Sequence, residues 1–234
     1  MNPDMLASGI SSNQNAASHG SAITKVIAER GITEVLHFTS APHGFVGICA
    51  RGLVRSRDRL DADDYIQHIY TPNCPNRIKD EDWTDFVSLS ITRVNKNMLG
   101  YSKSWHPEPG IWWVVLSFDP LILTHPGVHF TTTNNSYSKT VRRATGVGGL
   151  VDMFSNAVPW GHHGSVHYRS SDMPAHLTTD RQAEVLYPRE VSLQHLRAVY
   201  VAQDEHIDEV KTWIDLFPRT TPVVPVTSKP EVFA

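Results

Sequence analysis

Alternating and continuous apolar segments predict the strands of a sheet. In residues 85–92 (DFVSLSIT) every second position is apolar, which predicts a strand with one face on a core and one face open to a cleft. Residues 111–118 (IWWVVLSF) are almost wholly apolar, as expected of a central strand that is covered on both faces. Shorter apolar runs predict three more strands, at residues 34–39, 183–187 and 197–202.

Apolar residues at helical spacing predict three helices, over residues 21–31, 40–52 and 204–217. Each begins at a short polar side chain that can act as an N-cap, namely Ser21, Ser40 and Asp204. Gly31 and Gly52 are placed to end the first two helices. Few helices beside several strands indicate an α+β protein with a mostly antiparallel or mixed sheet.

The remaining segments lack clear periodicity. Residues 51–83 are polar and charged, and we expect an irregular region with at most one helix, around residues 61–69. Residues 124–182 are long and irregular, which is typical of binding loops. The expected organisation is a mobile N-terminal tail (1–20), one domain (21–217) and an extended Pro-rich C-terminal tail (218–234).

The composition excludes several classes of protein. With 40% hydrophobic and 19% charged residues among 234, the chain is an ordinary globular protein. A net charge of −3 argues against a broad basic surface, so contact with nucleic acid requires a local basic patch. Two cysteines, Cys49 and Cys74, are too few for a disulfide framework. Without a secretory signal or an apolar run of membrane-spanning length, we expect a cytoplasmic location and no membrane contact.

Three common kinds of functional site find little support. Thirteen histidines suggest a metal site, but His162 and His163 are adjacent, and Pro126 and Gly127 interrupt the pair His125 and His129. We therefore expect no metal. A hydrolase of the Ser-His-Asp type lacks its GxSxG turn. The GVGG cluster at residues 146–149 has no lysine after it, so a flexible connection is favoured over a phosphate-binding loop.

One carboxylate, Glu184, stands out because it lies inside an apolar strand. Strand alternation places it on the face opposite Val185. A carboxylate there is costly unless it is solvated, paired or used in chemistry. An ordinary solvent-facing glutamate and a functional one both remain open on the pattern alone.

Three segments taken together resemble the DarT family of ADP-ribosyltransferases, toxins of DarT/DarG systems that use NAD to modify bases of single-stranded DNA. They are HFT at residues 37–39, DFVSLSITRVNKNML at residues 85–99 and TTDRQAEVL at residues 178–186. The resemblance covers about residues 23–202. It implies a compact α+β ADP-ribosyltransferase-like fold, with two small mixed or antiparallel sheets around an NAD cleft and peripheral helices. It also implies Glu184 as the catalytic glutamate.

The resemblance implies that NAD serves as co-substrate and is held by residues near the first two segments. These are His37, Phe38, Thr39, Arg77, Ser88, Ser90, Met98 and Tyr101. Arg77 is chosen by position for the pyrophosphate or ribose oxygens, because a guanidinium can form paired bonds to them, and Arg51, Arg55 and Arg57 are alternatives. For Met98 and Tyr101, ordinary core packing is an equal alternative to a nicotinamide pocket.

The loop before Glu184 is expected to recognise the acceptor through Thr178, Thr179, Gln182, Arg169 and Arg181. The basic run Lys139, Arg142 and Arg143 is expected to carry the nucleic-acid strand, with a solvated charged loop as the alternative. The function expected is transfer of ADP-ribose to a base of single-stranded DNA, ahead of RNA, by a toxin or phage-defence effector that an antitoxin protein neutralises. A protein-directed transferase, an NAD glycohydrolase and an inert binding module are the alternatives.

Overall fold

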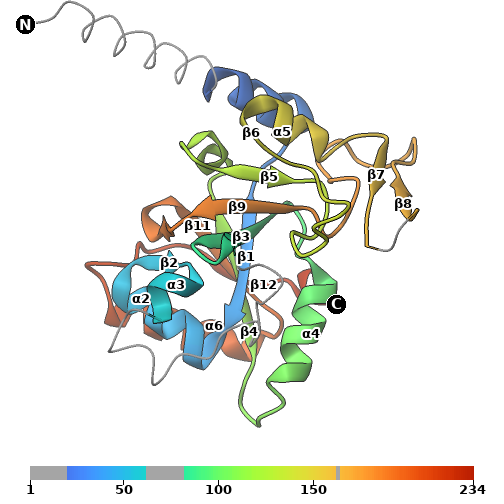
Figure 1. Cartoon of the computed structure of the whole chain (residues 1–234). Coiled ribbons are helices and arrows are strands. Elements are labelled where there is room, and N and C mark those ends of the chain that lie inside the picture. Colours follow the sequence, from blue (N-terminus) through green and yellow to red (C-terminus); the bar gives the residue numbers. More distant parts are fainter. Residues whose placement is uncertain (1–19, 62–81, 162–163) are drawn as a thin grey trace, which may run out of the picture.

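The computed structural model describes residues 20–61, 82–161 and 164–234. Within them, eight strands form one sheet in the order β12-β11-β4-β1-β3-β9-β5-β6, and two further pairs are β10-β2 and β7-β8 (Figure 1). The strands are β1 (Val35–Ser40), β2 (Leu53–Arg55), β3 (Phe86–Ile91), β4 (Trp113–Phe118), β5 (His129–Thr131), β6 (Arg143–Thr145), β7 (Ala157–Pro159), β8 (Val166–Tyr168), β9 (Glu184–Pro188), β10 (Glu190–Ser192), β11 (Leu196–Val201) and β12 (Val226–Ser228).

Helices gather at both ends of the sheet and along one side of it. Residues 20–30 form a helix that lies beside α5, whereas α2, α3 and α6 lie at the opposite end (Figure 1). The helices are α2 (Val46–Arg51), α3 (Arg57–Asp61), α4 (Lys96–Trp105), α5 (Gly146–Asp152) and α6 (Ile207–Leu216). Shorter turns are the π-helical η1 (Ala41–Phe45) and the 3-10 helices η3 (Pro120–Thr124), η4 (Leu193–His195), η5 (Asp204–His206) and η6 (Pro230–Val232).

The large sheet divides into two halves at the boundary between β1 and β3. β1 pairs with β4 along all of its six residues, but with β3 only at Val35↔Ile91 and Leu36↔Ser90. Beyond Leu36 the two strands separate. The expected pair of small sheets is therefore present as two halves of one mixed sheet, in which only β11 and β12 run parallel. This confirms the predicted fold class.

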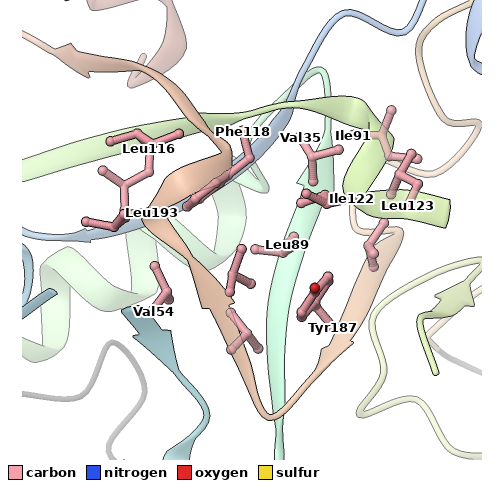
Figure 2. Close-up of a cluster of buried hydrophobic side chains, with 14 of the residues drawn as sticks. Val35, Val54, Leu89, Ile91, Leu116, Phe118, Ile122, Leu123, Tyr187 and Leu193 are labelled. Atoms are coloured by element: carbon pink, nitrogen blue, oxygen red, sulfur yellow. The ribbon is translucent and has the colours of Figure 1, made fainter. Parts of the chain in front are cut away.

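The predicted alternation of β3 and the continuous apolar run of β4 both correspond to burial in the structure. Val87, Leu89 and Ile91 of β3 are buried, and Figure 2 shows Leu89 and Ile91 pointing into the main core. All six residues of β4 are buried, because the strand is covered on both faces. The core thus forms where the apolar pattern predicts it.

A second, smaller core fixes α4 to the other side of the sheet. It joins Leu36 of β1, Leu99 of α4 and Phe233 near the C-terminus. Lys96 Nζ donates to the Glu231 carbonyl (3.1 Å) and Lys103 Nζ to the Phe233 carbonyl (3.4 Å). The final residues of the chain therefore hold α4 in place.

Several expectations need correction. Ser40 makes no capping hydrogen bond, and Asp204 begins the 3-10 turn η5 rather than α6. The segments expected to be irregular contain short elements, namely β2, α3, β5, β6, α5, β7 and β8. Strands of three residues are too short to show alternation, and only their pairing partners define them.

Within residues 218–234, β12 pairs with β11 and Phe233 is buried, so this segment packs into the fold. Residues 1–19, and the predicted helix around 61–69 beyond Asp61, lie outside the described residues.

Two neighbouring glycines of α5 give a test of its close approach to β6. A Cβ on Gly149 would lie 2.4 Å from the Ala144 carbonyl oxygen, a backbone atom, whereas a Cβ on Gly148 would meet nothing within 4 Å. We expect Gly149→Ala to lower the free energy of unfolding by about 1–3 kcal/mol, because the backbone must move. The control Gly148→Ala should change it by no more than about 1 kcal/mol, in the stabilising direction. Urea denaturation of both variants measures the difference, and equal stabilities would contradict the packing.

None of the helices in the described ranges is both long enough and apolar enough to cross a membrane.

Candidate active site

His37 reaches across the gap that opens between β1 and β3. Its Nδ1 lies 3.1 Å from the main-chain carbonyl oxygen of Ser88. A carbonyl oxygen only accepts, so Nδ1 carries the proton of this hydrogen bond. Burial lowers the pKa of His37 below its ordinary value of 6.5, and the ring is therefore neutral at pH 7. Its Nε2 is then a hydrogen-bond acceptor.

Ser88 also contacts Glu184. The Ser88 hydroxyl donates to Glu184 Oε1 at 2.7 Å. Glu184 is the first residue of β9 and is half-buried, whereas the next residue, Val185, is fully buried in the main core. The predicted alternation of this strand is thus correct. Ser88 is thus a contact of both residues, of His37 through its main-chain carbonyl and of Glu184 through its hydroxyl.

The side of the sheet that bears this pair can be derived from the register. Leu36, which packs in the small core with α4, is paired with Ser90. Paired residues share a face, and Ser88 and Ser90 share a face by alternation. The Ser88–Glu184 pair therefore lies on the α4 side of the sheet.

The other residues predicted near NAD have different surroundings. Phe38 packs edge-on against Trp113, with ring centroids 5.8 Å apart, and Thr39 is buried against Gly44. Met98 of α4 is half-buried. Tyr101 is 60% exposed and stacks on Trp105, so the structure leaves this ring at the surface of α4.

A buried polar segment, Thr131 to Asn135 (TTTNN), holds Glu184 from the other side. Thr131 Oγ1 accepts the Glu184 N–H (3.0 Å) and lies 3.1 Å from the Glu184 carbonyl oxygen, to which it can donate. The Asn135 N–H donates to Glu184 Oε2 at 2.8 Å. Hence main chain and carboxylate are both held by one short segment. This segment was not predicted from the sequence, although a run of buried Thr and Asn requires internal hydrogen-bond partners.

The loop before Glu184 is organised around Asp180, which is fully buried. Its Oδ2 accepts from the Thr133 hydroxyl (2.5 Å), and its Oδ1 accepts from the Gln182 N–H (2.8 Å). His167 Nδ1 lies 3.3 Å from the same Oδ1. Asp180 thus ties together three segments of the chain, a role that the sequence pattern did not indicate.

The acceptor-loop residues are largely turned inward. The Thr178 hydroxyl donates to the Asp180 carbonyl (2.7 Å), and the Thr179 hydroxyl to the Ser155 carbonyl (2.7 Å). Gln182 is only 7% exposed. The hydroxyl groups of Thr178 and Thr179 are therefore both hydrogen-bonded within the protein.

The predicted basic residues divide into two groups. Arg169 donates to the carbonyls of Leu177 and Pro174 (both 2.7 Å), and Arg143 binds Asn135, so both point into the fold. The side chains that remain exposed are those of Lys139, Arg142 and Arg181. Arg77 lies outside the described residues.

Arg93 was not predicted, although it lies within the second family-like segment. It follows β3, and its Nη2 donates to the Thr178 carbonyl at 2.6 Å. The pKa of the Arg93 guanidinium is lowered, mainly because the group is buried. Arg93 therefore connects the end of β3 to the loop before Glu184.

One other feature lies apart from the Ser88–Glu184 pair. A cavity of about 320 Å³ beyond the end of β1 is lined by Pro42, His43 and residues 108–111, and by neither member of the pair. The Ser88–Glu184 pair is the stronger candidate for the active site, because hydrogen-bonded groups rather than empty volume can act on a substrate. In the described part of the chain, no group of three or more His, Cys, Asp or Glu residues is arranged to hold a metal ion.

Comparisons with known proteins agree with this fold. A family model described as "DarT: ssDNA thymidine ADP-ribosyltransferase" matches residues 36–233. The structure of Thermus sp. 2.9 DarT in complex with NAD+ has a TM-score of 0.60 and 15% identity, covering 86% of this chain and 98% of that one. The same DarT in complex with ADP-ribosylated ssDNA gives 0.59 and 16%, covering 87% and 97%. Thermosipho africanus DarTG in complex with ADP-ribose gives 0.60 and 15%, covering 86% and 51%. No curated protein matches the sequence.

Proposed function

The chain belongs to the DarT family, and on that premise we propose that Glu184 is its catalytic residue. The family activity is transfer of ADP-ribose from NAD to thymidine of single-stranded DNA. One observation carries the assignment: Ser88 hydrogen-bonds through its carbonyl to His37 and through its hydroxyl to Glu184. The three family-like segments thereby meet at Ser88, which lies in the second of them and contacts a residue of each of the other two.

The proposed role of Glu184 is electrostatic. NAD supplies the ADP-ribosyl group with nicotinamide as leaving group, and positive charge develops on the ribose as the bond between them weakens. A fixed carboxylate beside this charge lowers the barrier, by the electrostatics that glycosidases use. Hydrogen bonds from Ser88 and Asn135 hold the carboxylate in one orientation, so it need not reorganise during the reaction. Glu184 is also proposed to accept the proton of the acceptor base.

The residues near the gap between β1 and β3 fit NAD chemically. Ribose hydroxyl groups are donors, and the Nε2 of neutral His37 is an acceptor for one of them. Phe38, Thr39, Ser90, Met98 and Tyr101 stay in the proposed NAD-contacting set. For the pyrophosphate we retain Arg77 as the proposal, with Arg51, Arg55 and Arg57 as alternatives.

For the acceptor we propose a thymine base of single-stranded DNA. A base must leave its stack to reach a half-buried carboxylate, which favours a single strand. The exposed cations Lys139, Arg142 and Arg181 are the proposed phosphate contacts. Thr178, Thr179, Gln182 and Arg169 are proposed to shape the loop that receives the base, because their hydrogen-bond partners lie within it or beside it.

The test uses NAD labelled in its adenosine and separate pools of oligonucleotides. We expect label on single-stranded DNA that contains thymidine, and none above background on matched strands without thymidine, on duplex DNA, on RNA or on protein. Label on protein, or free ADP-ribose as the only product, would replace this proposal by a protein-directed transferase or a glycohydrolase. Retained NAD binding with no product would indicate an inert binding module.

We further propose that the chain is a cytoplasmic toxin neutralised by an antitoxin protein of the macrodomain type or another type. Free NAD and single-stranded DNA occur together inside cells, and Cys49 is a free buried thiol, as expected in a reducing compartment. The Thermosipho africanus DarTG is about twice as long as the part that this chain covers, which leaves room there for a second domain.

A further inference from the structure

We propose that Arg143 is a positioning residue for Glu184 and acts through Asn135. The inference rests on the proposed role of Glu184. It also reassigns a residue that the sequence pattern places on the nucleic-acid surface.

Arg143 holds one residue by two of its atoms. Its Nε donates to Asn135 Oδ1 at 2.5 Å, and its Nη2 donates to the Asn135 carbonyl oxygen at 2.6 Å. Two donors of one planar guanidinium fix both the side chain and the main chain of Asn135. The N–H of the same residue donates to Glu184 Oε2 at 2.8 Å. The direction of that N–H, and with it the position of Oε2, therefore depends on Arg143.

The guanidinium itself is held in place. Arg143 lies directly opposite Thr131 in the β5–β6 pair, and Thr131 binds the main chain of Glu184. The guanidinium carbon lies 5.4 Å from the ring centroid of Trp83, which packs against Phe86 of β3. Arg143 is thus fixed between its own strand pair and an aromatic ring, as an orienting group needs to be.

These contacts leave Arg143 poorly suited to bind DNA. A phosphate that took its Nε and Nη2 would displace Asn135 and release the carboxylate. The side chain of the neighbouring Arg142 is exposed and makes long contacts, at 3.4 Å to Ser155 Oγ and 3.8 Å to Asp152 Oδ2. The two adjacent arginines therefore differ in their surroundings. Arg143 binds Asn135, which binds the carboxylate, whereas the side chain of Arg142 faces the solvent.

The experiment compares Arg143→Ala, Arg143→Lys and the control Arg219→Ala, which removes an exposed positive charge near α6, at the opposite end of the sheet (Figure 1). We expect Arg143→Ala to lower kcat by about 10- to 100-fold, because a small displacement of a catalytic group has effects of this size. The KM for the oligonucleotide should stay within about twofold, since the residue does not touch DNA. Arg143→Lys should recover little, because one ammonium group cannot bind both oxygens. Arg219→Ala should keep the wild-type kcat. Added guanidinium should restore part of the activity of Arg143→Ala and leave that of Arg219→Ala unchanged.

Other outcomes separate the competing explanations. A raised KM with unchanged kcat, and a salt slope reduced by about one, would make Arg143 a DNA contact and overturn the inference. A lower melting temperature with wild-type kcat, measured where circular dichroism shows folded protein, would make its role purely structural and would also overturn it. If Arg143→Ala does not fold, Arg143→Gln takes its place under the same criteria.

A double variant distinguishes this inference from the proposed function. In a Glu184→Gln background, Arg143→Ala should cause no further loss of kcat, because its effect passes through the carboxylate. A wild-type rate in Glu184→Gln alone would overturn the role of Glu184. Loss in Glu184→Gln with a wild-type rate in Arg143→Ala would overturn only the role of Arg143.

Discussion

Replacing Glu184 by glutamine is expected to lower the rate constant of ADP-ribose transfer by about 10²-fold or more. Glutamine has the size of the native side chain, and its carbonyl oxygen can still accept from Ser88 or from Asn135. It lacks the negative charge that stabilises positive charge on the ribose, so the loss falls on the chemical step. Single-turnover transfer to a thymidine-containing oligonucleotide measures that step without product release.

The controls for this variant concern binding and surface charge. NAD affinity should change by only a few fold, because most of the dinucleotide lies away from one carboxylate. Glu205→Gln removes an equal charge from a side chain that is 72% exposed, and it should keep the wild-type rate. If Glu184→Gln transfers ADP-ribose as fast as the wild type, the catalytic assignment is wrong.

Asp180→Ala is expected to lower the free energy of unfolding by about 3 kcal/mol or more, since several buried donors lose their acceptor. The Thr133 hydroxyl and the Gln182 N–H would be left without their present partner in a fully buried place. Activity should fall as well, because the same loop leads into Glu184. Urea denaturation monitored by tryptophan fluorescence gives the free energy.

Two matched variants sharpen this second test. Asp180→Asn keeps an acceptor oxygen and should lose less stability than Asp180→Ala. Asp215→Ala removes a carboxylate from the exposed surface of α6 and should change the free energy by about 0.5 kcal/mol or less. Equal free energies of unfolding for Asp180→Ala and Asp215→Ala would show that the buried carboxylate of Asp180 does not stabilise the fold.

The fold could be predicted where a strand is long enough to show its period. β3 alternates over six residues and β4 is apolar at all of its six residues but Ser117, and the structure places both as predicted. The pairs β5–β6 and β7–β8 have strands of three residues, and long-range register defines them. Helix starts were predicted less well, because the side chains of Ser40 and Asp204 do not make the capping bonds that their residue types allow.

In the candidate site, too, some residues could be predicted from the sequence and others could not. His37, Ser88 and Glu184 could be selected because family-like motifs contain them, and strand alternation correctly orients Glu184. Asn135 and Asp180 could not be selected, because their importance comes from bonds to segments about 50 residues away. Arg142 and Arg143 look alike in the sequence. Only the pairing of β6 with β5 decides which of them points inward.

The short seam between β1 and β3 has a consequence for chimeric enzymes. Within the large sheet of the described residues, β1 with His37 is hydrogen-bonded to the half that bears Glu184 only through β3, so the β5–β6 hairpin can be grafted from a relative without touching His37. Such a graft must carry Thr131, Asn135 and Arg143 together, because each completes bonds made by another or by Glu184. The hydrogen bonds that hold Glu184 are then exchanged as one unit, while β1 with His37 stays unchanged.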